Sequence, residues 1–284
     1  MKIALIALLY LVLAPILGGL LAGLDRIVTA RMQSRIGPPL LQPFYDTLKL
    51  LSKENLAVNH FQNFYLFCFL VFMIVTGGLF FAGGDLLLAI FALTLADIFL
   101  VLAAYSANSP YSILGAEREL ILMMAYEPIL LICAIGFYMV THSFGVHDIL
   151  VFNRPLILYM PAIFVCMLIV LTIKLRKSPF DLSTSHHGHQ EVVKGLTTEF
   201  SGPALALIEI AHWYETVLLL GLMYLFFASY HPLAIIAVSL TYFFVTFIDN
   251  TYARTKWQYA VRSAWLVAAT LGVGNIVFLY YVTH

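Results

Sequence analysis

The sequence predicts an all-α membrane protein with eight transmembrane helices and one amphipathic helix on the cytoplasmic side. Of its 284 residues, 62% are hydrophobic and 11% are charged, whereas a soluble domain is roughly half apolar and about a quarter charged. Lipid must therefore solvate most of the chain. The 15 Lys and Arg residues balance the 15 Asp and Glu residues, so no excess of charge points to a nucleic acid partner.

Eight runs of sequence are long enough and poor enough in charge to cross a bilayer, which takes about 20 helical residues. They cover residues 3–24, 63–82, 86–105, 119–140, 156–174, 203–228, 231–248 and 263–282. The first run has the flanks of a signal peptide, but its apolar stretch exceeds the usual roughly 7 to 15 residues, so we expect a retained helix. Because the runs explain the composition, residues 1–284 are expected to form a single polytopic membrane domain.

The basic residues are distributed unevenly between the two sides of the predicted bundle. They concentrate in four loops, which cover residues 25–62, 106–118, 175–202 and 249–262. Thirteen of the 15 lie there, counting Lys174 at the edge of one loop, and only Lys2 and Arg154 lie on the other side. Basic residues mark the cytoplasmic side of membrane proteins. We therefore expect these loops inside the cell, both termini outside, and the protein in the cell (inner) membrane.

The first inner loop contains a helix breaker followed by a helical pattern. Pro38, Pro39 and Pro43 exclude a continuous helix. Phe44, Leu48 and their apolar neighbours then recur every three to four residues beside charged side chains. This pattern predicts a short amphipathic helix that lies at the membrane surface or against a partner.

The third inner loop is rich in histidine. His186, His187, His189 and Glu191 are close enough in sequence to suggest a metal site. A zinc site usually needs four ligands at defined spacing, and the Gly inside this segment leaves no clear helical geometry. A solvated or partner-facing loop, whose histidines carry protons near neutral pH, is the favoured interpretation. We therefore predict no metal site in this chain.

The three cysteines also argue against a resident redox centre. Cys68, Cys133 and Cys166 are far apart and lie in apolar runs. An iron-sulfur cluster needs about four thiolates, usually close in sequence. If the chain serves a redox enzyme, the electrons must travel in other subunits.

Four acids lie inside the predicted spans, at Asp97, Glu127, Glu209 and Glu215. Such groups are costly in lipid, so they should face the protein interior or a water-filled path. One interpretation is a proton path. The alternative is that each acid pairs with Arg or His and fixes helix packing, but we expect no Lys or Arg in mid-membrane to neutralise all four.

Two local patterns favour the proton path. Pro128 follows Glu127 and should kink its helix, which leaves an unpaired backbone carbonyl near the carboxylate. His212 lies three residues from both Glu209 and Glu215, so its imidazole is placed to exchange protons with either acid.

Motifs in all four inner loops resemble those of one known family. They are RMQSRIGPPLLQPFYDTLKLLSKE from Arg31, SANSPYSILGAERELILMMAYEP from Ser106, SPFDL from Ser178 with GLTTEFSGP from Gly195, and TYARTKWQYAVRSAW from Thr251. The chain resembles the H subunit of proton-pumping NADH:quinone oxidoreductase, which is mitochondrial subunit 1 of complex I. It is more similar to the counterpart of that protein in membrane-bound, energy-converting NiFe hydrogenases, and nearest to the Ech type.

The resemblance implies roles for individual residues. Glu127 matches the family's channel acid after Tyr, Glu199 the acid before an aromatic residue and Ser-Gly, and Glu191 the last acid of an acidic run. The family's acid in the sixth span falls on Ala211, so Glu209 or Glu215 must substitute for it. With the acids found above, the expected proton path comprises Asp97, Glu127, Glu191, Glu199, Glu209, His212 and Glu215. The residues expected to dock the hydrophilic arm are Arg31, Arg35, Asp46, Arg118, Asp181, His186, His187, His189 and Arg254.

Several departures from the quinone-reducing pattern favour the hydrogenase branch. The stretch at Pro38 and Pro39 is closed up, the His-rich segment replaces a short acidic run, and Asp249 and Gln258 stand where the family has Arg and Asp. These changes affect the region that would line a quinone chamber.

We therefore expect a non-catalytic membrane-anchor and ion-coupling subunit of a ferredoxin-linked NiFe hydrogenase complex. Its partners would be hydrophilic hydrogenase and iron-sulfur subunits, which carry the NiFe centre and the 4Fe-4S clusters, and an antiporter-like membrane subunit. A quinone-site subunit of a complex I-like NADH dehydrogenase is the main alternative. An independent secondary transporter is a third, although the sequence has no pair of broken spans in matching halves.

Overall fold

The computed structural model describes residues 2–57, 59–177, 179–180 and 192–283, and most of them are helical. The elements in chain order are α1 Lys2–Met32, α2 Gln42–Leu51, α3 His60–Phe81, α4 Leu86–Ser106, α5 Pro110–Thr141, α6 Val146–Val151, the 3-10 helix η1 Leu156–Leu158, α7 Pro161–Lys174, α8 Gly202–Leu225, α9 His231–Thr251, α10 Trp257–Val267, the π-helix η2 Ala268–Gly272 and α11 Val273–Thr283. Extended pairing in the described residues is limited to two isolated bridges. The prediction of an all-α fold is confirmed.

Seven helical segments in the described part of the chain are long and apolar enough to cross a membrane. They are α1 from Leu8, α3, α4, α5, α8, α9 and the continuous terminal helix formed by α10, η2 and α11. Their positions follow the predicted runs, with α4 at Leu86–Ser106 where residues 86–105 were expected. The predicted span at residues 156–174 differs, because its apolar helix is only the 14 residues of α7.

The local structure at each of its two ends makes α7 short. Pro161 occupies its first turn, where proline is favourable, and Met160 before it has a non-helical backbone. At the other end, Arg176 has a φ of 57°, and the backbone N–H groups of Arg176 and Lys177 donate to the carbonyls of Ile173 and Thr172 at 3.0 and 2.9 Å. This is the Schellman arrangement that closes a helix. Fourteen residues rise only about 21 Å, against about 30 Å for a bilayer core.

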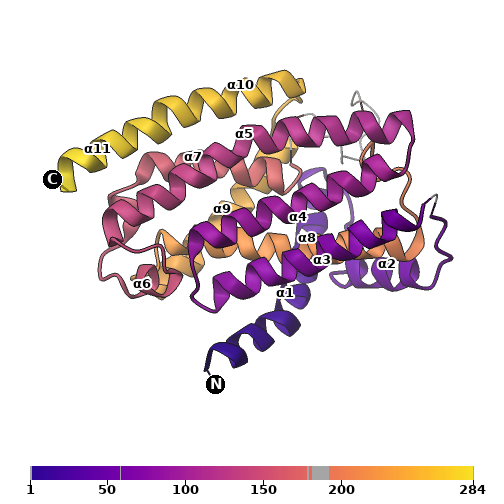
Figure 1. Ribbon diagram of the computed structural model, residues 1–284, viewed down its shortest axis with the longest axis horizontal. Coiled ribbons are helices and arrows are strands. Elements are labelled where there is room, and N and C mark those ends of the chain that lie inside the picture. Colours follow the sequence, from indigo (N-terminus) through magenta and orange to yellow (C-terminus); the bar gives the residue numbers. More distant parts are fainter. Residues whose placement is uncertain (1, 58, 178, 181–191, 284) are drawn as a thin grey trace.

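The long helices pack around a buried centre. Helices α3, α4 and α5 lie side by side (Figure 1), and α3 also packs against α8, which contacts α1 and α9. The terminal helix runs along α5 and contacts α7 (Figure 1). Large side chains without solvent exposure, such as Phe69, Tyr126, Phe137 and Phe226, fill the centre.

Helix α2 occupies the place predicted for the amphipathic helix. It begins at Gln42-Pro43 and packs against α1 and α8, with the Phe44 ring centroid 5.0 Å from that of Trp213. Tyr45 and Leu48 on its other side are exposed. A location of α2 at the membrane surface stays a prediction.

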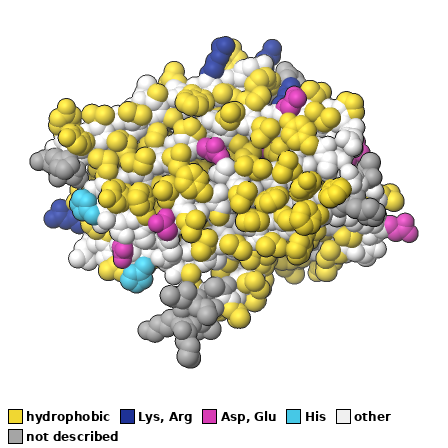
Figure 2. All heavy atoms as spheres, in the orientation of Figure 1, with side chains coloured by type: hydrophobic (Ala, Val, Ile, Leu, Met, Phe, Trp, Pro, Cys, Tyr) yellow, Lys and Arg dark blue, Asp and Glu magenta, His cyan; other side chains and the backbone are white. Residues whose placement is uncertain are grey.

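The outer surface of the bundle is largely apolar. Figure 2 shows one face on which hydrophobic side chains dominate and charged side chains are few. Exposed large side chains include Phe243 and Phe247 on α9 and Trp265 and Phe278 on the terminal helix. Apolar patches of this extent are rare on soluble monomers, and with the seven long apolar helices they identify a multi-pass membrane protein.

Candidate functional site

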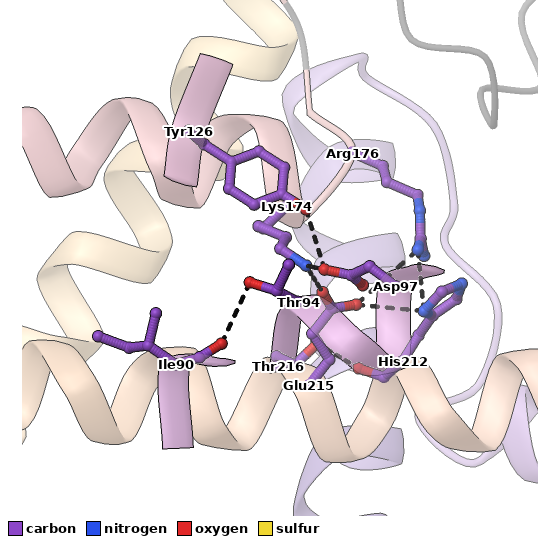
Figure 3. A network of polar contacts seen from close by, with 9 residues as sticks. All are labelled: Ile90, Thr94, Asp97, Tyr126, Lys174, Arg176, His212, Glu215 and Thr216. Atoms are coloured by element: carbon purple, nitrogen blue, oxygen red, sulfur yellow. Dashed lines mark hydrogen bonds and ion pairs between the residues drawn. The ribbon is translucent and has the colours of Figure 1, made fainter. Parts of the chain in front are cut away.

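A network of charged side chains lies in the middle of the bundle, around the end of α7 (Figure 3). The Nζ atom of Lys174 donates to Asp97 on α4 and to Oε1 of Glu215 on α8, the latter at 2.7 Å. All three residues are buried, with exposed fractions of 6%, 7% and 3%. A cation between two carboxylates satisfies charges that would be very costly alone in the membrane interior.

Tyr126 on α5 completes the buried side of the network. Its hydroxyl donates to Oδ2 of Asp97 at 2.9 Å, and Lys174 Nζ lies 4.8 Å from the centre of its ring. The phenol therefore provides both a hydrogen bond for the carboxylate and a cation–π contact for the ammonium. Four helices thus supply the side chains of this part of the network.

Lys174 corrects one expectation from the sequence. The sequence predicts no basic group in mid-membrane and places Lys174 at the inner surface, but its side chain is buried between Asp97 and Glu215. Two of the four acids thus have the basic partner that the alternative interpretation requires. The reason for the burial of Lys174 is the length of α7. Asp97 lies nine residues before the end of α4, or about 14 Å along the helix axis, so a helix ending beside Asp97 ends well inside the bundle.

Arg176 follows two residues later and reaches α8. One guanidinium nitrogen lies 2.9 Å from Nδ1 of His212 and 3.8 Å from Oε2 of Glu215. Arg176 has the left-handed backbone conformation at the position where a Schellman motif usually has glycine. A non-glycine residue there is strained.

The hydrogen bonds of His212 depend on its protonation. Its Nδ1 atom lies 3.2 Å from Oε2 of Glu215 and also faces Arg176. An unprotonated Nδ1 accepts from Arg176, whereas a protonated Nδ1 donates to Glu215, and one nitrogen cannot do both. The tautomer and the charge of His212 together therefore decide which neighbour its Nδ1 atom binds.

Two cavities meet at this network. The larger, about 470 Å³, lies among α1, α8, α9 and the segment after α7, and Glu209 and His212 are part of its wall. The smaller, about 10 Å³, is bounded by Asp97, Glu119 and Tyr126, and is just large enough for one water. Three residues, Lys174, Arg176 and Glu215, line both cavities. These three residues therefore separate the two cavities.

A second charged group also lines the larger cavity. Lys177 Nζ lies 2.5 Å from Oδ2 of Asp25 on α1 and 3.4 Å from Oδ2 of Asp249 on α9. Thr246 donates to the other oxygen of Asp25 at 3.0 Å. Lys174, Arg176 and Lys177 lie within four consecutive positions of the chain and pair with acids on four different helices.

The structure brings together some of the residues predicted for the proton path. Asp97, His212 and Glu215 belong to the network, and Glu209 lines the larger cavity. Glu127 is half-buried on α5 next to Tyr126 in sequence, and it is not among the network members in the described part of the chain. The half-buried Glu199 lies in the loop before α8, where its backbone carbonyl accepts from Gln62 at 3.2 Å.

The residues predicted to dock an arm are spread over the loops. Arg31 and Arg35 are exposed, Arg254 is half-buried, and the half-buried Arg118 lies over the Trp257 ring at 5.7 Å. Asp46 pairs with Arg26. The remaining predicted residues, Asp181, His186, His187, His189 and the proton-path residue Glu191, lie outside the described residues. Among the residues that the structure describes, no three or more metal-ligating side chains form a group that could hold an ion.

The pair of Arg26 and Asp46 joins α1 to α2, and its stability depends on pH. Partial burial alone would raise the pKa of Asp46, but hydrogen bonds from Arg26 and Gln42 and the charges of Arg26 and Lys49 outweigh it, so the pKa lies below its usual value. A carboxyl whose folded pKa is lowered stabilises the fold above its unfolded pKa, and this contribution is lost as pH falls through the folded value.

We therefore expect Asp46→Asn to weaken the attachment of α2 to α1 at neutral pH. The variant should also lose the part of the weakening at acid pH that arises from protonation of Asp46. The effect should be small, because both side chains are about 40% exposed and solvent screens such pairs. Limited proteolysis of the loop before α2, at a series of pH values from neutral into the acid range, measures it. Equal acid sensitivity in Asp46→Asn and the wild type would contradict this assignment.

Comparison with known proteins identifies the family. The NADH dehydrogenase family matches residues 3–280 of the chain. The H subunit of NADH-quinone oxidoreductase from Dehalococcoides mccartyi is 27% identical over 89% of this chain and 79% of its own length. Hydrogenase-4 component C of Escherichia coli K12 is 25% identical over 92% of this chain and 90% of its own length.

A solved structure has the same fold. A chain of the membrane-bound sulfane sulfur reductase, described as an archaeal respiratory membrane complex, aligns with a TM-score of 0.84 and 24% identity, over 97% of this chain and 100% of that one. By their names, the two relatives in sequence are a subunit and a component of larger enzymes. The family match over nearly the whole sequence shows that the chain belongs to the NADH dehydrogenase family, which includes the H subunit of complex I.

Proposed function

We propose that this chain is the non-catalytic membrane-anchor and ion-coupling subunit of a ferredoxin-linked, membrane-bound NiFe hydrogenase complex of the Ech type. The observation that carries the ion-coupling role is the position of Lys174 between Asp97 and Glu215, with a cavity on either side. The hydrogenase assignment is supported by the departures from the quinone-reducing sequence pattern. Two acids and two cations balance in the network, so one added proton leaves a net positive charge. A buried group of this kind marks an ion or proton path in membrane proteins.

The proposed path begins at the inner loops and enters the larger cavity. Glu199 and Glu191 come first in the proposed order, Glu209 and His212 follow, and charge passes through Glu215 and Lys174 to Asp97. From there it continues towards an antiporter-like membrane subunit. Redox change in the hydrophilic arm would move the inner loops, and the loop at residues 175–202 begins directly after Lys174. Movement of this loop would change the pairing of all three cations at the end of α7.

The arrangement in the cell follows from the distribution of basic residues. We place the chain in the inner membrane as a single polytopic domain, with both termini outside and the arm-docking loops in the cytoplasm. The NiFe centre and the 4Fe-4S clusters belong to hydrophilic partner subunits. Arg31, Arg35, Arg118 and Arg254 would contact these partners.

A quinone-site subunit is the second candidate, because relatives include subunits named for NADH-quinone oxidoreductase. The volume of the larger cavity, about 470 Å³, lies within the usual range for small-molecule sites. Its wall, however, has acids at Asp25, Glu209, Glu215 and Asp249. Such a wall suits water and ions better than an isoprenoid quinone, whose burial needs apolar side chains.

Purification of the native complex distinguishes the two candidates. Mass spectrometry of the co-purifying subunits is expected to find a NiFe-type large subunit and iron-sulfur proteins. The purified complex should produce hydrogen from reduced ferredoxin and should not reduce an added short-chain quinone. A quinone-type arm with quinone reductase activity would overturn the hydrogenase assignment.

Glu127→Gln tests a residue that we propose for the path from the family resemblance, although the network of described residues does not include it. In inverted membrane vesicles, we expect the gradient formed per hydrogen produced to fall to less than about a tenth, the scale of losing one proton-transfer group. Dye-linked hydrogenase activity of the detached arm should be unchanged. Glu117→Gln, an exposed acid on the same helix, is the matched control. Normal coupling in Glu127→Gln would make Glu127 a structural residue.

A further inference from the structure

The N-terminus of α7 lacks a capping side chain of its own. Met160 at the N-cap position makes no side-chain hydrogen bond to the helix, and Pro161 follows it. The first N–H groups of a helix have no partner within the helix. In a membrane, where water cannot replace the missing acceptor, such groups must be satisfied by protein.

A side chain from the terminal helix supplies the missing acceptor. Oδ1 of Asn275 on α11 accepts from the backbone N–H groups of Ala162 and Ile163, each at 3.2 Å. Nδ2 of Asn275 donates to the backbone carbonyl of Tyr159 at 3.0 Å. Asn275 is only 6% exposed. Both polar atoms of this side chain are thus used to hold the start of α7.

A second contact fixes α7 one turn further on. The Sγ atom of Cys166 lies 3.7 Å from the carbonyl oxygen of Val267, at the point where the π-helix η2 begins. A Cβ atom on Gly272 would lie 3.1 Å from Ile132 and 3.9 Å from Cys166, so glycine allows the terminal helix to approach α5 and α7 closely. These contacts hold α7 against the terminal helix near its outer end.

We propose that Asn275 is a positioning residue that sets the depth of α7 and thereby holds Lys174 between Asp97 and Glu215. A helix of 14 residues is stiff, so a shift at its N-terminus is transmitted to its C-terminus, where Lys174 is the last residue. The residue type fits this role, because the site needs an acceptor for two N–H groups and a donor for one carbonyl, and Asn has both. The consequence for ion coupling rests on the proposed function, whereas the effect on α7 does not.

The test compares Asn275→Leu with Asn275→Asp in the assembled complex. Leu removes all three hydrogen bonds, whereas an ionised Asp keeps the acceptor and lacks a donor for the Tyr159 carbonyl. Alkylation of native cysteines by N-ethylmaleimide, followed by peptide mass spectrometry, measures the exposure of Cys166 on α7 and of Cys133 on α5. Both thiols are buried in the wild type. Thr270→Val is the matched control, because Thr270 is exposed on the same terminal helix and its hydroxyl bonds within that helix.

Asn275→Leu should speed alkylation of Cys166 by at least about fivefold, as expected when buried N–H groups lose their acceptor, with little change at Cys133. The gradient formed per hydrogen should fall with it, and Asn275→Asp should recover part of both. An equal increase in the alkylation rates of Cys133 and Cys166 in Asn275→Leu would mean general destabilisation and would overturn the inference. Wild-type alkylation rates in Asn275→Leu would overturn it too. If instead Lys174→Met leaves coupling intact, the proposed function fails while the Cys166 result still decides the role of Asn275.

Discussion

A Lys174→Met variant is expected to lose ion coupling and to be destabilised by about 3 to 5 kcal/mol, the usual cost of removing one partner from a buried ion pair. Met fills a similar volume, so the effect arises from charge. Asp97 and Glu215 would then face each other without the cation between them. The thermal midpoint of the purified complex measures the loss of stability, and gradient formation in vesicles measures coupling.

A variant that neutralises the whole group separates the two effects. Replacing a buried ion-pair set by neutral side chains of similar shape is often neutral or stabilising. We therefore expect Lys174→Met with Asp97→Asn and Glu215→Gln to recover most of the lost stability without recovering coupling. Lys53→Met, at an exposed position of the first inner loop, should behave as the wild type. Recovery of coupling in the triple variant would show that the group acts only in packing.

The sequence predicts most of the fold because membrane helices have a strong signal. A run of about 20 apolar residues has few alternatives in a bilayer, and α4 and α9 begin at the residues expected. The span at residues 156–174 was less well predicted, since hydropathy does not register where a helix is interrupted. Pro161 was the available signal, because proline in the middle of an apolar run can mark a new first turn.

The candidate site was only partly predictable from the sequence. Acids within apolar runs are conspicuous, so Asp97 and Glu215 were predicted, and the spacing of His212 to Glu209 and Glu215 pointed to the imidazole. Lys174 was missed because it lies at the end of its run, where a basic residue is usually an interfacial anchor. Its burial depends on how deep α7 ends, which in turn depends on contacts from α11 more than 100 residues away. Such long-range packing has no local sequence signal.

Arg176→Gly is expected to preserve the end of α7 but to lose most ion coupling. The backbone at this position has a φ of 57°, which glycine adopts without strain. The Schellman hydrogen bonds of α7 should therefore persist. The guanidinium, however, is the donor that faces His212 at 2.9 Å, and without it an unprotonated Nδ1 atom of His212 loses that partner. Coupling should fall because the alternation of His212 between Arg176 and Glu215 is no longer available.

Two further substitutions distinguish the backbone of Arg176 from its side chain. Arg176→Ala lacks the guanidinium and keeps the strained backbone, so its complex should be about 1 kcal/mol less stable than that of Arg176→Gly with the same loss of coupling. Arg176→Lys keeps the charge but lacks the planar donor group, and we expect it to restore coupling only in part. Thermal midpoints of the three purified complexes and gradient formation in vesicles test this order. Full coupling in Arg176→Gly would remove Arg176 from the path, and equal midpoints for the Gly and Ala variants would show that the left-handed backbone at this helix end costs nothing.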